Sequence, residues 1–88
     1  MRFIYAAVLL LLSHSAFAEG AKCTSQAKET WLSEDAMKAK VTALGYTYKI
    51  FKVTPGNCYE IYGQDQAGKR VEIYFNPVTG EIVEQHKS

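Results

Sequence analysis

Apolar residues recur with a helical period after residue 31. One face of such a helix would carry three of them, at spacings of four and three: Met37, Val41 and Leu44. Ser33 is a suitable N-cap, because its hydroxyl can accept a hydrogen bond from a first-turn N–H. Gly45 suits the position just beyond a helix C-terminus. The pattern predicts an amphipathic helix over residues 34–44.

The rest of the chain alternates in the manner of β-strands. Runs rich in tyrosine, isoleucine and valine cover residues 46–54, 58–65 and 69–76, and residues 81–85 can add a short fourth strand. Turn-forming residues separate these runs by only a few positions, which predicts hairpins and an antiparallel meander. Apolar side chains alternate with polar ones along the third run. The first run does not alternate, because Ile50 and Phe51 are adjacent, and either a β-bulge or a strand with apolar residues on both faces would explain this.

These elements predict an α+β fold, with one N-terminal amphipathic helix on a three- to four-stranded antiparallel meander (α-β-β-β). The helix would cover one face of the sheet. Alternation places four polar residues on the other face, with Lys49 beside them if the register allows: Glu60, Tyr62, Glu72 and Tyr74. Such a face is either simply solvated or a partner-binding surface in which tyrosines supply apolar area.

The first eighteen residues have the three parts of a secretory signal peptide. Arg2 gives a positive start, an apolar block follows, and Ala16-Phe17-Ala18 is a small-residue cleavage site. The apolar block is short for a membrane span, which needs about 20 residues, although a retained anchor helix is the alternative. We expect cleavage after Ala18 and export to the periplasm or the medium, with no stable membrane insertion of the product.

Composition limits what the exported part can do. Without Arg2, nine basic residues balance nine acidic ones, and this balance argues against a nucleic-acid binder. The expected organisation is a polar segment (residues 19–30), one domain (31–85) and a polar tail (86–88). A domain of this size is marginally stable without a covalent tie.

The two cysteines, Cys23 and Cys58, would provide that tie as a disulfide in an oxidising compartment. An intermolecular bridge is the alternative. A zinc site needs three or four ligands, whereas His86 is the one histidine after the signal segment. Redox pairs usually have C-x-x-C spacing, which is absent. We therefore expect no metal or other cofactor.

The final third resembles a known family. The run "GKRVEIYFNPVTGEIV", and above all "YFNPVTGEIV" (residues 74–83), is similar to the ending of PepSY domains, although Asn76 stands where that family more often has aspartate. The resemblance covers about residues 31–84. Its motif is also a turn, which either sets the register of the last strand or contacts a ligand; its residues are Asn76, Pro77, Thr79, Gly80 and Glu81.

The resemblance implies an exported protein-binding module that inhibits or modulates a peptidase. No pattern of nucleophile, phosphate loop or metal ligands points to an enzyme. The alternatives are a small-ligand-binding accessory or sensor protein and a structural homodimer of the cell envelope.

Overall fold

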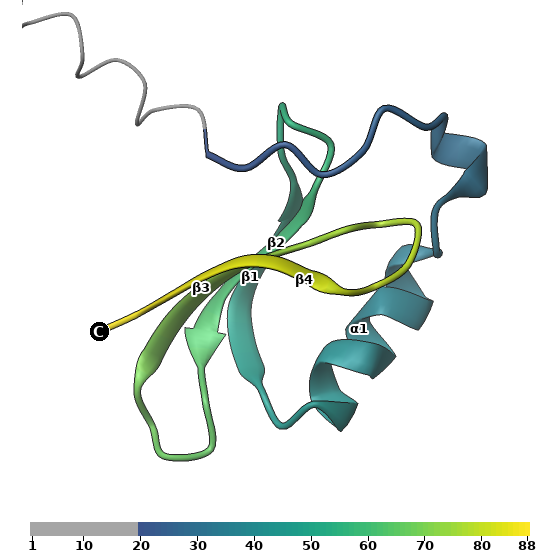
Figure 1. The fold of residues 1–88 in the computed structure, drawn as a ribbon. Coiled ribbons are helices and arrows are strands. Elements are labelled where there is room, and N and C mark those ends of the chain that lie inside the picture. The colour runs from purple at the N-terminus through teal and green to yellow at the C-terminus, as the bar shows by residue number, and fades with distance from the viewer. Residues whose placement is uncertain (1–19) are drawn as a thin grey trace, which may run out of the picture.

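A computed structural model, which describes residues 20–88, contains one α-helix and a four-stranded antiparallel sheet (Figure 1). A short 3-10 turn precedes the helix, and four strands follow it in order: η2 (Lys28–Thr30), α1 (Glu34–Ala43), β1 (Thr47–Val53), β2 (Tyr59–Gln64), β3 (Arg70–Phe75) and β4 (Ile82–Lys87). The strands are neighbours in sequence order, which confirms the meander. The expected signal peptide lies outside the described residues.

The helix has the expected cap but not the expected face. Ser33 Oγ accepts a hydrogen bond from the Ala36 N–H at 3.0 Å. Met37 and Val41 are fully buried, whereas Leu44 is the C-cap residue and is 50% exposed. The prediction of an N-terminal amphipathic helix is therefore wrong: α1 follows an ordered polar segment and buries two side chains instead of a continuous stripe. Leu44 leaves that stripe because the chain turns away there, at Gly45 (φ 96°).

The core lies between α1 and one face of the sheet, which we call the near face. Its fully or almost fully buried side chains come from the helix and from alternate positions of β2 and β3: Met37, Val41, Tyr59, Ile61, Val71, Ile73 and Phe75. Each such side chain contributes about 1.5–3 kcal/mol through burial. Trp31 lies at one end of this core, where its ring meets that of Tyr59 edge-on, with 5.5 Å between the ring centroids. The alternation of β2 and β3 predicted this face.

Both outer strands carry a register shift. In β1 the shift lies between Tyr48 and Ile50, so Lys49 is a bulge residue. The shift confirms the irregularity inferred for this strand. In β4 a second shift leaves Val83 between the partners of Tyr74 and Phe75. β4 also continues to Lys87, beyond the strand expected over residues 81–85.

A disulfide joins Cys23 to Cys58, as predicted. It holds residues 20–23, the N-terminal strap, against the turn between β1 and β2, and the strap passes beside this hairpin in Figure 1. The Cys23 N–H donates to the Gly56 carbonyl at 3.0 Å. A Cβ at Gly56 would lie 2.2 Å from the Ala21 carbonyl oxygen, so this glycine makes room for the strap.

Within residues 20–88, no helix has the length and apolar character needed to span a bilayer.

Candidate binding site on the far face of the sheet

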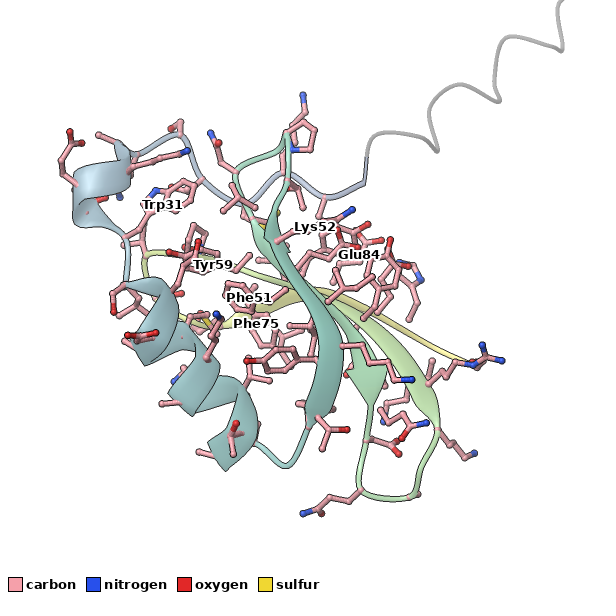
Figure 2. The ribbon with its side chains drawn as sticks, turned by 180° about the vertical axis from the view of Figure 1, so that it is seen from behind. Trp31, Phe51, Lys52, Tyr59, Phe75 and Glu84 are labelled. Carbon is pink, nitrogen blue, oxygen red and sulfur yellow. A yellow bond between two sulfur atoms is a disulfide. The ribbon has the colours of Figure 1, made fainter. Side chains whose placement is uncertain are left out.

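The face of the sheet opposite α1, the far face, carries the polar residues predicted from sequence. In Figure 2 Phe51 and Phe75 lie toward the helix, whereas Lys52 and Glu84 lie on the other side of the sheet. Strand pairing arranges the far-face side chains in two cross-strand rows, Ile50–Tyr62–Glu72–His86 and Lys52–Glu60–Tyr74–Glu84. The four predicted residues are thus neighbours. Their role in binding a partner stays a prediction.

Glu60 is buried, although its strand position suggested a solvated side chain. Only 2% of Glu60 is exposed. Its Oε1 lies 3.9 Å from Lys52 Nζ, and its Oε2 accepts no hydrogen bond from any donor in the described part of the chain. Burying an unpaired carboxylate is costly, and such a group usually becomes neutral instead.

Glu72 is a hydrogen-bonding partner that favours the protonated form of Glu60. Burial, followed by the hydrogen bond to Glu72, raises the pKa of Glu60. That hydrogen bond, aided by those from Tyr74 and Tyr62, lowers the pKa of Glu72. The Tyr74 hydroxyl donates to Glu72 Oε2 at 2.8 Å. Of the two carboxyls, Glu60 is therefore the one that protonates more readily, and Glu72 is the one that ionises more readily.

The tyrosines remain protonated beside these carboxyls. Burial, then hydrogen bonding to Glu60 and Glu72, raises the pKa of Tyr62 to about 12. Burial and the hydrogen bond to Glu72 also raise the pKa of Tyr74. Both hydroxyls are therefore donors at ordinary pH. Tyr62 also offers its ring, since Lys52 Nζ lies 5.5 Å from the ring centroid.

The far face is hollowed in two places. The larger hollow, of about 730 Å³, lies between the first row and the ends of the strands, and its lining includes Ile50, Tyr62, Glu72 and His86. The smaller one, of about 230 Å³, is lined by β1 and the following turn together with Glu60, Tyr62 and Tyr74. A volume of 730 Å³ is in the range of small-molecule and peptide side-chain sites.

Sequence reasoning missed four residues of this face. Ile50 and Lys52 take the β1 positions, because the bulge at Lys49 shifts the alternation. Glu84 and His86 come from β4, where Glu84 Oε2 lies 2.6 Å from His86 Nε2. A bulge can be suspected from the adjacent Ile50 and Phe51, but its position within the strand cannot be read from the sequence.

The family-motif turn between β3 and β4 is tightly hydrogen-bonded. Asn76 Oδ1 accepts from the Val78 N–H at 2.8 Å, and Gly80 (φ 79°) donates its N–H to the Asn76 carbonyl at 2.7 Å. The Glu81 N–H donates to Thr79 Oγ1 at 3.1 Å. These bonds explain the local need for asparagine, threonine and glycine. A ligand contact by this turn stays a prediction.

The same turn also anchors the segment before α1. The fully buried Pro77 accepts a hydrogen bond from the Leu32 N–H at 2.8 Å. The amide Nδ2 of Asn76 donates to the Cys23 carbonyl at 3.2 Å. An ionised aspartate could not make this second bond, because it has no donor. Asparagine at position 76 therefore provides a hydrogen bond to the disulfide-bonded strap that aspartate could not provide.

Residues 20–88 contain no group of three histidine, cysteine or acidic side chains placed to hold a metal ion.

Comparison with known proteins gives one match. A family model described as "Peptidase propeptide and YPEB domain" matches residues 2–86, nearly the whole chain. No curated protein and no solved structure matches significantly.

Proposed function

The chain belongs to the peptidase propeptide and YPEB domain family, and on that premise we propose that it is an exported, non-catalytic module that binds and modulates a peptidase. The far face of the sheet is the docking surface. The family supports a peptidase-related interaction, and the signal-like first eighteen residues support export to the periplasm or the medium.

The observation that carries this proposal is the composition of the far face. Tyr62 and Ile50 expose 39% and 47% of their surfaces there, side by side on paired strands. They border a hollow large enough for a partner's side chain. Exposed aromatic and aliphatic groups next to fixed hydrogen-bonding groups are typical of the centre of protein interfaces.

The test uses the protein purified from the exported fraction and a metallopeptidase from the same compartment. We expect the protein to change the rate of peptide hydrolysis, and the Tyr62→Ala/Tyr74→Ala variant to lose at least about tenfold in apparent affinity, since aromatic anchors contribute 1–2 kcal/mol or more. Leu44→Ala is the control, because Leu44 is also an exposed apolar side chain but lies at the C-terminal end of α1, outside the far face. Equal effects of both variants would contradict docking through the far face.

The larger hollow also favours a second candidate, an accessory protein that binds a small ligand. A dialysable metabolite that raises the melting temperature of the protein, and fails to do so in Tyr62→Ala, would support this function. No shift across a broad metabolite panel would exclude it. A structural homodimer predicts instead that the mass measured by light scattering rises with protein concentration.

A further inference from the structure

We propose that the carboxyl pair of the far face, Glu60 with Glu72, receives one basic side chain of the partner, an ammonium or a guanidinium group. This inference rests on the proposed function, because it specifies the chemistry of the group that docks there. It concerns the part of the far face that borders the smaller hollow.

The first reason is the incomplete hydrogen bonding of Glu60. Its side chain is almost completely buried, lines the smaller hollow, and has an oxygen, Oε2, that accepts from no donor in residues 20–88. Lys52 approaches the other oxygen, and only at 3.9 Å. A group with several N–H donors and a positive charge is the complement of such a site.

The second reason is the balance of charge around the pair. The charged and titratable groups around Glu60 come from the neighbouring strands: Lys52 on β1, Tyr62 on β2, and Glu72 and Tyr74 on β3, with Glu84 and His86 following on β4 in the same cross-strand rows. His86 is already engaged with Glu84 at 2.6 Å. Lys52 is therefore the cation beside Glu60, at 3.9 Å, and protonation of Glu60 lowers the negative charge that the Glu60–Glu72 pair would otherwise carry.

The third reason is that the site already holds one ammonium in a comparable setting. Lys52 Nζ lies over the Tyr62 ring and beside Glu60. An aromatic face next to a carboxylate favours organic cations. The larger hollow, on the Glu72 side, is by contrast lined by Lys49, Arg70 and Lys87. A further cation is therefore better accommodated at the smaller hollow, beside Glu60.

Binding of a basic group is coupled to proton release. A cation at the pair favours the ionised form of Glu60, so the proton of Glu60 leaves to solvent as the ion pair forms. Affinity for the basic group should therefore rise with pH until Glu60 is ionised in the free protein. A neutral ligand would show neither the proton release nor this pH dependence.

The experiment titrates the exported protein with two matched pentapeptides, acetyl-Gly-Val-Arg-Val-Gly-amide and the same peptide with citrulline in place of arginine. Citrulline keeps the shape and removes the charge. We expect the arginine peptide to bind about tenfold or more tightly, because hydrogen bonds between charged groups are stronger than those of a neutral urea group. Calorimetry in two buffers of different ionisation enthalpy should show proton release for the arginine peptide.

Glu60→Gln is the decisive variant, because glutamine keeps the shape and cannot ionise. It should abolish proton release and reduce the preference for arginine several-fold, whereas Glu29→Gln, at an exposed carboxylate on η2 outside the far face, should change neither. Equal binding of the two peptides, an unchanged preference in Glu60→Gln, or peptide-induced dimers in light scattering would overturn the inference.

The two proposals fail separately. Suppose that the arginine and citrulline peptides bind equally well, but Tyr62→Ala/Tyr74→Ala still abolishes the effect on the peptidase. The inference of a basic group on the partner is then wrong, and the proposed function stands. If arginine is preferred but no peptidase is affected, the proposed function is wrong and the cation site stands.

Discussion

The near and far faces of this sheet are made from alternate residues of the same strands, yet they are stabilised in different ways. On the near face, Ile61 and Ile73 pack against α1 and have no polar atoms to satisfy. On the far face, the equivalent central positions hold Glu60, whose pKa is raised by burial, and Glu72, which accepts a hydrogen bond from the Tyr74 hydroxyl. Apolar packing stabilises the near face, whereas the stability of the far face depends on the ionisation of Glu60 and Glu72. A change of pH or the arrival of a charged partner can thus alter the far face without disturbing the core.

The largest expected effect concerns the strap at the disulfide end of the sheet. The double variant Cys23→Ser/Cys58→Ser should lose about 4 kcal/mol of unfolding free energy, because a loop closed over a separation of 35 residues is no longer constrained in the unfolded chain. Urea unfolding measures this loss. An unchanged midpoint in the variant would show that the bridge does not stabilise the domain.

A pair of isoleucines compares the two faces directly. Ile61→Ala removes a fully buried near-face side chain and should cost about 3 kcal/mol, from lost burial and a residual cavity. Ile50→Ala, on the far face, should stay within about 0.5 kcal/mol of the parent protein. Both are measured by urea unfolding. Similar losses for the two variants would mean that the far face is packed as a second core.

Asn76→Asp tests the link between the family-motif turn and the strap. The carboxylate keeps the acceptor for the Val78 N–H but loses the donor to the Cys23 carbonyl, so we expect a loss of about 1 kcal/mol. The loss should shrink in the Cys23→Ser/Cys58→Ser background, where the strap is no longer held, and a double-mutant cycle measures this coupling. If the free-energy losses of Asn76→Asp and of Cys23→Ser/Cys58→Ser simply add, Asn76 and the disulfide do not act together on the strap.

The smallest expected effect depends on pH. The raised pKa of Glu60 contributes stability that is present at acidic pH and lost as the pH rises through the folded-state value. The lowered pKa of Glu72 contributes stability that is lost as the pH falls through its own folded-state value. The parent protein should therefore be most stable between these two values, in mildly acidic solution.

Glu60→Gln should remove the loss of stability on the alkaline side of the pH profile, because the glutamine amide can donate a hydrogen bond to Glu72 at every pH. Relative to the parent, the variant should gain stability as the pH rises from about 4.3, the usual pKa of a glutamate in an unfolded chain, through the raised folded-state pKa of Glu60. Urea unfolding over this range measures the difference. A constant difference would show that Glu60 does not titrate in the folded protein.

The sequence was informative where a single strand decides the outcome. Alternation in β2 and β3 predicted the near face, and the turn residues predicted the meander. The burial of Glu60 could not be predicted, because it depends on Lys52, Tyr74 and Glu84 across three strand pairings. Leu44 had the right spacing for the helix face, but the chain had already begun to turn there.

Part of the candidate site could also be predicted from alternation within single strands. Four of its members came from strand alternation, and the structure places them together. Ile50 and His86 required the exact register of the outer strands, which bulges and tertiary packing determine. The departure from the family's aspartate at Asn76 was visible in the sequence, but its physical reason appears only in the contact with Cys23.

The interruptions in the two outer strands have a consequence for how another chain can approach. An extended peptide that added itself to the sheet would need an unbroken row of backbone donors and acceptors, and neither β1 at Lys49 nor β4 at Val83 presents one. The same irregularities discourage copies of this protein from polymerising edge to edge. Under the proposed function, a partner is then recognised by side chains on the broad surface of the sheet, where selectivity can be encoded residue by residue.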